Sequence, residues 1–277
     1  MKKIRALIFT LIASVCAVSF CGCNLLSIIT QNAAPVSDYK SETEISADSL
    51  MQVRETIRSF NISIDTMYYR NQGWFSRLQG TSLGSGVVFE EDETYYYALT
   101  NNHVITNVID GVSYSTIYSV TDIYGTTYGG QYSANDVTVV SKDGEDNDIA
   151  IIRFKKKSTA TYTLPKANYT ARKDTNMSPG EFVFAVGNPS GVNNIVTYGE
   201  MISWARIGNV SYNVLHHNAL INPGNSGGAL CDIDGNLLGL NTWGAEDTDD
   251  DNYSISLTQI NEFIDAFHAN QSLDNAA

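Results

Sequence analysis

The sequence predicts an all-β protein, a barrel or a sandwich, that ends in one helix. Short runs of β-branched and aromatic residues recur along most of the chain and are separated by Gly, Asn and Asp, which is the pattern of short strands joined by turns. Hydrophobic residues make up 43% of the 277 residues, which is enough to fill a substantial core. Near the end of the chain, Ile260, Phe263, Ile264 and Phe267 recur at the spacing of one helix face.

The elements follow in chain order from these patterns. A short helix is expected near Ser49–Ser59. After it, the runs expected as strands are 61–64, 85–89, 94–100, 115–123, 136–140, 149–154, 181–187, 194–203, 229–233 and 236–243. Thr258 is a suitable N-cap for the terminal helix, because its hydroxyl can accept a hydrogen bond from a first-turn amide. The sequence contains no internal repeat, and the residues after Ser226 are needed to finish the sheet and this helix, so no second domain of ordinary size is expected.

The N-terminal segment predicts export. Three basic residues within the first five precede an apolar run at 6–20, which is the layout of a secretory signal. Gly22 and Cys23 resemble the end of a bacterial lipobox, so residues 1–23 are expected to be a signal peptide with lipidation of Cys23. Because apolar residues continue through 25–29, an uncleaved anchor helix is the alternative. In either case, residues 24–55 are expected to form a flexible linker and the short helix, which hold the domain at the outer face of the bacterial cell membrane.

Composition limits the partners. The balance of 30 acidic against 17 basic residues gives a formal charge of −13, which disfavours nucleic acid because phosphates are repelled. Of the four cysteines, only Cys231 lies in the body of the chain, so no internal disulfide is expected and the thiol is interpreted as buried and inert.

No cofactor and no metal site are expected. His216 and His217 are neighbours in sequence, so in a strand their side chains point to opposite faces and do not readily chelate one ion. The acidic run at 245–251 lacks the spacing of an EF-hand. A solvated loop is the first interpretation of this run, and attraction of basic peptides or weak Ca²⁺ binding remain open alternatives.

Three segments carry residues suited to nucleophilic catalysis. They are "LTNNHVI" around His103, "EDNDIAIIRF" around Asp148 and "PGNSGGAL" around Ser226. A serine hydroxyl is a poor nucleophile, so it needs a base to remove its proton, and the base needs a partner that fixes its tautomer. His103 and Asp148 can supply these two roles. The chain order His, Asp, Ser is that of the chymotrypsin-type arrangement.

With these motifs, the chain resembles the trypsin-like serine peptidases, and specifically the bacterial HtrA (Deg) branch. The resemblance covers about 81–266 and adds "LGSGVVF" at 83–89, "VGNPSG" at 186–191 and "GNLLGLNT" at 235–242. It implies two perpendicular six-stranded β-barrels with the active site between them. Within a peptidase domain at 56–277, barrel 1 would span about 56–165, barrel 2 about 178–257 and the terminal helix 258–269. Most HtrA proteins also carry a C-terminal PDZ domain, which is not expected within this sequence.

The loop "NPGNSGGAL" is interpreted as the oxyanion hole. Gly224, Asn225 and Ser226 are small or turn-prone, so the backbone N–H groups of Gly224 and Ser226 can converge on one point. In trypsin-like digestive enzymes an aspartate directly before the nucleophile binds the ammonium freed by zymogen cleavage. Asn225 is neutral, so we expect that switch to be absent and the uncleaved domain to be competent.

The resemblance also implies where substrate binds. The residues before the oxyanion loop, Ala219, Leu220 and Ile221, would form the floor of the S1 pocket, and the cleft would further be lined by Asn241, Thr242, Trp243 and Gly244. No acid lies at 219–222, so small or medium apolar P1 residues are expected.

Together these observations predict a secreted, membrane-tethered serine endopeptidase that acts on exposed or unfolded protein segments through an acyl-enzyme. Protein or peptide substrates are the expected partners, and a homotrimer is possible from the resemblance. One alternative is a non-catalytic lipoprotein that binds peptides in the same cleft. Another is a peptidase that stays inactive until a ligand or partner orders its loops.

Overall fold

The computed structural model describes residues 46–72, 75–106, 108–109, 112–143, 147–191, 194–207, 210–244 and 251–274. The expected signal peptide, Cys23, the linker up to residue 45 and residues 245–250 of the acidic run lie outside these ranges. Within these ranges, no helix has the length and apolar character that a membrane span requires.

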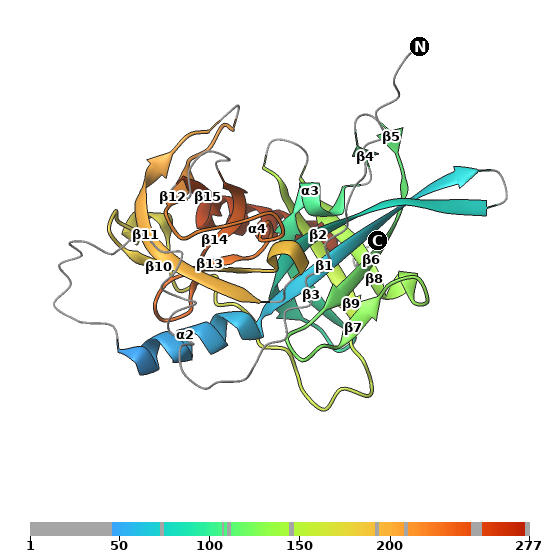
Figure 1. The fold of residues 1–277 in the computed structure, drawn as a ribbon, viewed down its shortest axis with the longest axis horizontal. Coiled ribbons are helices and arrows are strands. Elements are labelled where there is room, and N and C mark those ends of the chain that lie inside the picture. Colours follow the sequence, from blue (N-terminus) through green and yellow to red (C-terminus); the bar gives the residue numbers. More distant parts are fainter. Residues whose placement is uncertain are drawn as a thin grey trace, which may run out of the picture.

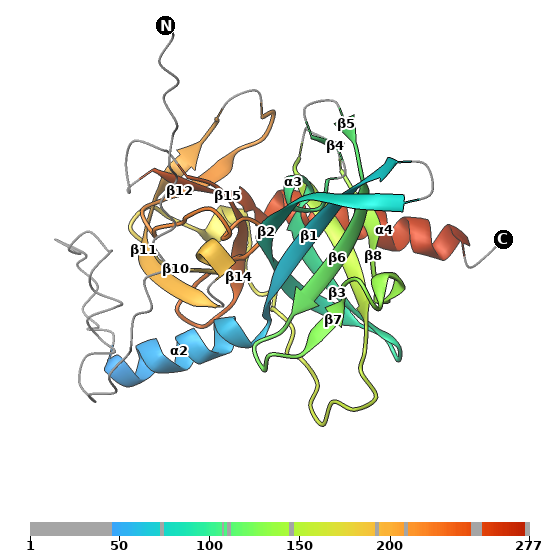
Figure 2. The ribbon, with the colours of Figure 1, turned by 45° about the vertical axis from the view of Figure 1, so that its right-hand side comes forward.

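The C-terminal half is a closed barrel (Figures 1 and 2). Its six antiparallel strands, in spatial order, are β10 (Phe182–Gly187), β11 (Ile195–Ala205), β12 (Val214–His217), β15 (Asn252–Ser256), β14 (Leu237–Gly244) and β13 (Ala229–Cys231), and β13 pairs again with β10. Val183, Leu215, Leu230 and Ile255 are fully buried inside it. Because a closed barrel has no free sheet edge, every strand here is paired on both sides.

The N-terminal half is a curled seven-stranded antiparallel sheet. Its strands, in spatial order, are β7 (Thr127–Gly129), β6 (Ser115–Thr121), β1 (Asn61–Gln72), β2 (Phe75–Glu91), β3 (Tyr95–Asn101), β9 (Ile149–Lys155) and β8 (Val137–Lys142). A separate two-stranded sheet joins β4 (Val108–Ile109) and β5 (Val112–Ser113). Short 3-10 turns lie at η1 (Ala134–Asp136), η2 (Asp174–Asn176) and η3 (Pro189–Gly191).

This architecture confirms the expected all-β fold with a terminal helix. The second half is the expected closed six-stranded barrel, whereas the first half is a curled seven-stranded sheet in place of a second six-stranded barrel. The architecture differs in detail where the sequence carries little hydrophobic pattern. Strands β1 and β2 continue well beyond the expected runs 61–64 and 85–89 and form a long hairpin that projects from the body (Figures 1 and 2). The outer part of this hairpin is exposed, with Phe75 at 57% and Leu78 at 49%, so backbone pairing rather than burial carries the strands outward. Strands β12 and β15 were not expected from the sequence. They are short and contain His, Asn and Ser, so they lack the apolar pattern by which the other strands were recognised.

Two helices close the domain. Helix α2 (Ala47–Ser59) is capped by Ser46, whose hydroxyl accepts the Ser49 amide at 3.1 Å, and it buries Val53 and Ile57 against the body. Helix α4 (Leu257–Asp274) starts one residue before the expected range and ends beyond it. Ile260 and Ile264 of α4 are buried. The Phe267 ring of α4 packs on Tyr97 of β3 at a centroid distance of 5.9 Å, so this helix ties the end of the second barrel to the first sheet.

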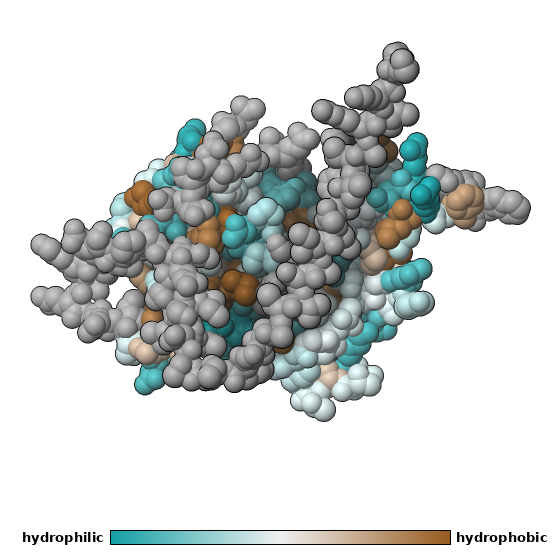
Figure 3. Space-filling view, in the orientation of Figure 1, coloured by the Kyte–Doolittle hydropathy of each residue, from teal (hydrophilic) through white to brown (hydrophobic). Residues whose placement is uncertain are grey.

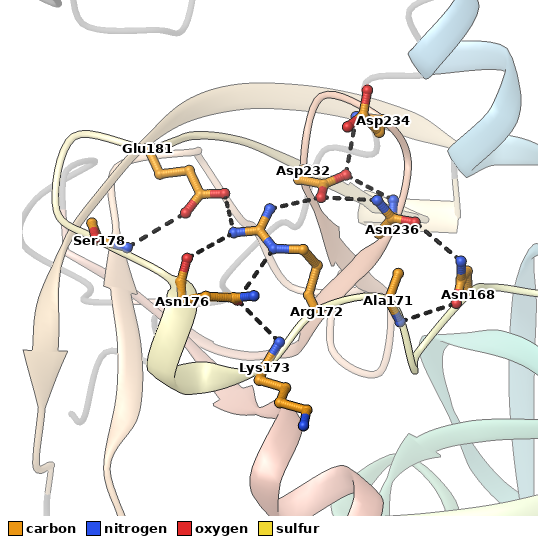
Figure 4. A network of polar contacts seen from close by, with 10 residues as sticks. All are labelled: Asn168, Ala171, Arg172, Lys173, Asn176, Ser178, Glu181, Asp232, Asp234 and Asn236. Carbon is orange, nitrogen blue, oxygen red and sulfur yellow. Dashed lines mark hydrogen bonds and ion pairs between the residues drawn. The ribbon is translucent and has the colours of Figure 1, made fainter.

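A polar network fastens the linker between the two halves to the second barrel (Figure 4). The Arg172 guanidinium lies 2.8 Å from Asp232 and 2.6 Å from Glu181. Asp232 begins the turn between β13 and β14, and its other oxygen accepts the amides of Asp234 and Asn236.

On the face shown in Figure 3, hydrophilic and hydrophobic residues are interspersed. The continuous apolar runs of the sequence are buried in the two halves.

Candidate active site

His103 lies on a single helical turn at the end of a buried strand. Strand β3 ends at Asn101, and α3 (Asn102–Ile105) follows at once. Val104 and Ile105 are buried and anchor this turn. The His103 side chain remains 47% exposed, so the turn holds an imidazole at the surface on a rigid support.

Asp148 binds this histidine at two points. One carboxylate oxygen, Oδ2, lies 2.8 Å from His103 Nδ1, and the other, Oδ1, accepts the His103 backbone amide at 2.9 Å. Because a carboxylate only accepts hydrogen bonds, Nδ1 is the donor in this contact, and Nε2 is the nitrogen that carries the lone pair in the neutral imidazole. The Asp148 side chain is 14% exposed, so little water competes for it.

The backbone at Asp148 adopts an uncommon conformation. Its φ is +51°, a left-handed value that asparagine and aspartate tolerate better than most residues. The Asp148 carbonyl accepts the Asn102 amide and the Asn101 side-chain amide, both at 3.0 Å. Tyr212, from the loop between β11 and β12, donates to the carbonyl of Asn147 at 3.1 Å. These contacts fix the aspartate from both halves of the molecule.

Asn101 links the histidine turn to the second barrel. Its side-chain nitrogen donates both to Asp148 and, at 3.0 Å, to the hydroxyl of Thr242 on β14. The Thr242 carbonyl in turn accepts the Ser226 hydroxyl at 3.4 Å. The structure therefore brings His103, Asp148 and Ser226 to one junction between the two halves, although the Ser226 hydroxyl is bonded to Thr242 and not to His103 among the described residues.

The loop that carries Ser226 is built around glycines that cannot be replaced without strain. Gly224 has a φ of +106° and Gly227 a φ of +83°. A Cβ atom at Gly224 would lie 2.4 Å from the Asn188 carbonyl oxygen, and one at Gly227 would lie 2.2 Å from the Ser85 carbonyl oxygen. Both conformation and close packing therefore require glycine on each side of the serine.

Two amides of this loop are left as free donors. The amides of Asn225 and Gly228 bind loop carbonyls at 2.9 Å, and the Gly227 amide binds the Asn241 carbonyl at 2.8 Å. The amides of Gly224 and Ser226 have no acceptor within the described part of the chain. Of the three residues expected in the oxyanion hole, Asn225 is the one whose amide already donates to a carbonyl of the loop.

The residues expected to line the S1 pocket are held by hydrogen bonds to their backbone. The Leu220 carbonyl accepts the Thr197 hydroxyl at 2.7 Å, and the Ile221 amide donates to the Asn252 side chain at 3.3 Å. Ala219 is fully buried, whereas Leu220 and Ile221 each remain 8% exposed. No acidic residue is present at 219–222.

The residues of β14 that were expected to line a substrate cleft divide into two groups. The Asn241 side chain is buried and donates to the carbonyls of Val186 and Ala229, so it stabilises the barrel. Thr242 is 5% exposed and contacts the junction described above. Trp243 is partly exposed and Gly244 is exposed, which leaves these two as the accessible members of the set.

The side chains of His216, His217 and Cys231 are held by burial and by contacts with neighbouring residues of the second barrel. Burial lowers the pKa of His217 to about 3, and its Nε2 lies 3.0 Å from the Ser254 hydroxyl. His216 stacks on Tyr253 at 4.9 Å and lies 2.8 Å from Asp251. Cys231 is fully buried, and burial raises its thiol pKa. Among the residues that the structure describes, no cluster of three or more His, Cys, Asp or Glu side chains is arranged to hold a metal ion.

Sequence reasoning missed the polar residues that support the site. Asn101, Ser85 and Asn188 are all buried, and each lies inside a motif already recognised for another reason. The available signal was a polar residue among small or apolar neighbours within a strand or at its end, as in "LGSG" and "VGNP", because such a residue needs a specific partner once buried.

Comparisons with known proteins identify the family to which this chain belongs. A family profile described as "Trypsin-like peptidase domain" matches residues 84–240. Serine protease HTRA1 of Xenopus tropicalis is 31% identical over 211 residues, which cover 74% of this chain and 40% of that protein. Periplasmic serine endoprotease DegP of Escherichia coli is 34% identical over 164 residues, which cover 58% of this chain and 30% of DegP.

A solved structure of the HtrA-type protease AlgW with a tripeptide has the same fold. It superposes with a TM-score of 0.60 at 24% identity and covers 78% of this chain and 62% of that chain. The chain thus spans well under half the length of the two sequence relatives. The family match covers more than half of the chain and includes His103, Asp148 and Ser226. The chain belongs to the trypsin-like peptidase domain family and is homologous to the HtrA and DegP proteases.

Proposed function

We propose that this chain is an exported serine endopeptidase that cleaves exposed or unfolded segments of proteins. The proposal is carried by the two-point contact of Asp148 with His103, beside a serine loop that keeps two amides free. A histidine held through Nδ1 presents Nε2 as a general base, which is the arrangement that serine peptidases use.

The reaction follows from these positions. The Ser226 hydroxyl turns from Thr242 toward His103 and attacks the peptide carbonyl carbon, while its proton passes to His103 Nε2. The tetrahedral intermediate then loses the amine, which takes the proton from His103 as the C–N bond breaks. Water, activated by the same histidine, attacks the acyl-enzyme ester, and the acid leaves as Ser226 regains its proton. Asp148 stabilises the imidazolium formed in each half.

The free amides of Gly224 and Ser226 would bind the oxyanion in both tetrahedral intermediates. Loss of one such donor in a serine peptidase costs about 100- to 1000-fold in rate, so a loop that spends its other amides internally while leaving these two free is suited to this role. The Ser226 hydroxyl and these two amides lie on the same short loop. The nucleophile and the oxyanion donors therefore keep their positions relative to one another.

Substrate selection would rest on the apolar floor at Ala219, Leu220 and Ile221, with the substrate backbone along Trp243 and Gly244. A basic P1 side chain would lose its hydration there without an acidic partner, so small or medium apolar residues are favoured. Export, a lipid on Cys23 or an uncleaved anchor helix, and assembly into a trimer are parts of the same proposal that the N-terminal sequence and the HtrA homology support.

Turnover of an unfolded protein tests this proposal. We expect Ser226→Ala and His103→Ala to lower casein cleavage to near background, and Asp148→Asn to do nearly as much, because the three residues act as a unit and their effects do not add. Wild-type protein that binds casein without cleaving it would instead support the non-catalytic peptide-binding alternative.

A further inference from the structure

The residue before the nucleophile does not organise the oxyanion loop through an ion pair. Asn225 is 2% exposed and uncharged, and its side-chain oxygen is without a hydrogen-bond partner among the described residues. Some other group must therefore hold the peptide units that flank it. The structure offers one candidate that contacts both neighbours of Asn225.

That candidate is Ser85 on β2, in the other half of the molecule. Its hydroxyl lies 2.7 Å from the Gly224 carbonyl, and its backbone amide donates to the Ser226 carbonyl at 2.8 Å. These two contacts hold the two residues whose free amides form the proposed oxyanion hole. Ser85 therefore fixes the loop on both sides of Asn225 without charge.

The direction of the Ser85 hydroxyl is determined by its neighbours. Asn188 donates to the Ser85 oxygen twice, from its backbone amide and from its side-chain nitrogen, each at 2.9 Å. A hydroxyl has two lone pairs and one proton, so once both lone pairs accept, the proton is left for the Gly224 carbonyl. Ser85 is fully buried, so no water competes for these bonds.

Asn188 is itself anchored to the first sheet. Its side-chain nitrogen also donates to the Ile62 carbonyl at 2.9 Å, and its side-chain oxygen accepts the Asn194 amide at 2.8 Å. Asn194 is held in turn by the side chain of Asn61, the first residue of β1, at 2.8 Å. The network thus connects the start of β1 to the Ser226 loop through residues that are at most 3% exposed.

We propose that Ser85 is a positioning residue that orients the oxyanion loop of this peptidase in place of an ammonium–aspartate pair. The inference rests on the proposed function, because it concerns the rate at which Ser226 reacts. Within the described part of the chain, Ser85 makes no hydrogen bond to His103 or Asp148, so it acts on the amides and not on the proton transfer.

The test compares the wild type with Ser85→Ala, with Ser85→Cys and with the matched control Tyr128→Phe. Tyr128 is 1% exposed, and its hydroxyl donates to Asp122 at 3.0 Å in the first sheet, so the control also deletes one buried hydroxyl. Titration of each protein with a fluorophosphonate probe gives the concentration of Ser226 that can react. We then measure KM for a peptide substrate, and kcat per labelled Ser226, across pH 5 to 9.

We expect Ser85→Ala to lower kcat per labelled site by roughly 10- to 100-fold, with KM within about twofold of the wild-type value, because a small misplacement of a catalytic group has this size of effect. The pH dependence should keep its shape. Ser85→Cys, with a weaker donor, should fall between Ser85→Ala and the wild type. Tyr128→Phe should match the wild type per labelled site even if fewer sites are active.

Several results would overturn the inference. Ser85→Ala with a wild-type kcat per labelled site would show that Ser85 only stabilises the fold. A shifted pH profile would place its effect on His103 and Asp148 instead. If Ser85→Ala does not fold, a wild-type kcat for Ser85→Cys has the same force. Absence of labelling at Ser226 in the wild type removes the proposed function itself, and with it this inference, whereas the results above leave the proposed function standing.

Discussion

Replacement of Arg172 by alanine should destabilise the domain strongly, although Arg172 lies on the linker between the two halves and not in a core. Its guanidinium bridges Asp232 at 2.8 Å and Glu181 at 2.6 Å and also donates to the Asn176 carbonyl at 3.2 Å (Figure 4). Asp232 is only 3% exposed, so loss of Arg172 leaves a nearly buried carboxylate without its cation.

The magnitude follows from what Asp232 keeps. Removal of one partner of a buried ion pair costs about 3–5 kcal/mol. Asp232 retains hydrogen bonds from the amides of Asp234 and Asn236 and from the Asn236 side chain, at 2.8 to 3.0 Å. Arg172 is 19% exposed, so water can reach part of the vacated space. We therefore expect a loss of about 2–3 kcal/mol in the free energy of unfolding, somewhat below the range for a buried pair whose remaining charge has no other partner.

Urea unfolding measures this loss, and a background of Ser226→Ala in every protein prevents self-cleavage during the experiment. The control is Arg58→Ala on α2, whose partner Glu55 lies at the same kind of distance, 2.9 Å, but is 65% exposed. The control should lose less than about 1 kcal/mol. Equal losses in Arg172→Ala and Arg58→Ala, or a loss below about 1 kcal/mol for Arg172→Ala, would refute the reasoning from burial.

Three further predictions concern pH, specificity and activation. Because burial lowers the pKa of His217 from 6.5 to about 3, the unfolded chain binds a proton there before the folded chain does, so stability should fall as pH drops from about 6.5 toward 3. His217→Gln should flatten that part of the curve in urea unfolding at a series of pH values, and parallel curves would show that other groups dominate. A peptide library should be cut mainly after Val, Ala, Ile or Leu, and a profile dominated by Arg or Lys would mean that acids outside 219–222 bind the P1 side chain. A protein that begins near Ser49 should be active with its intact mass preserved, whereas activity that appears only after a defined cut between Ser49 and Ser85, with the new N-terminus buried, would contradict the role assigned to Asn225.

The fold class and the tight glycine turn around Ser226 could be predicted from the sequence because both depend on local patterns. Glycine on both sides of Ser226 indicates a backbone that only glycine adopts without strain, and the apolar run at 149–154 after Asp148 indicates a strand in the core. The HtrA resemblance added the pairing of these segments, which no local pattern contains.

The hydrogen bonds that Ser85 and Arg172 make could not be predicted from the sequence, for a different reason. Ser85 and Gly224 are 139 positions apart in sequence, and Arg172 and Asp232 are 60 apart. Their hydrogen bonds exist only once both halves have folded and met. Residues 75–81 of β2 escaped prediction because they are all exposed, so no alternation of buried and exposed side chains marks this part of the hairpin.

The central claim is that Ser226 is a nucleophile activated by His103 and Asp148. Reaction of the purified domain with a fluorophosphonate probe, followed by mass spectrometry of the labelled peptide, tests it most directly, because this chemistry requires an activated serine and a competent oxyanion hole together. We predict stoichiometric labelling at Ser226 in the wild type, strongly slowed labelling in His103→Ala, and none in Ser226→Ala. Labelling at another residue, or wild-type protein that is folded and stays unlabelled, would contradict the claim.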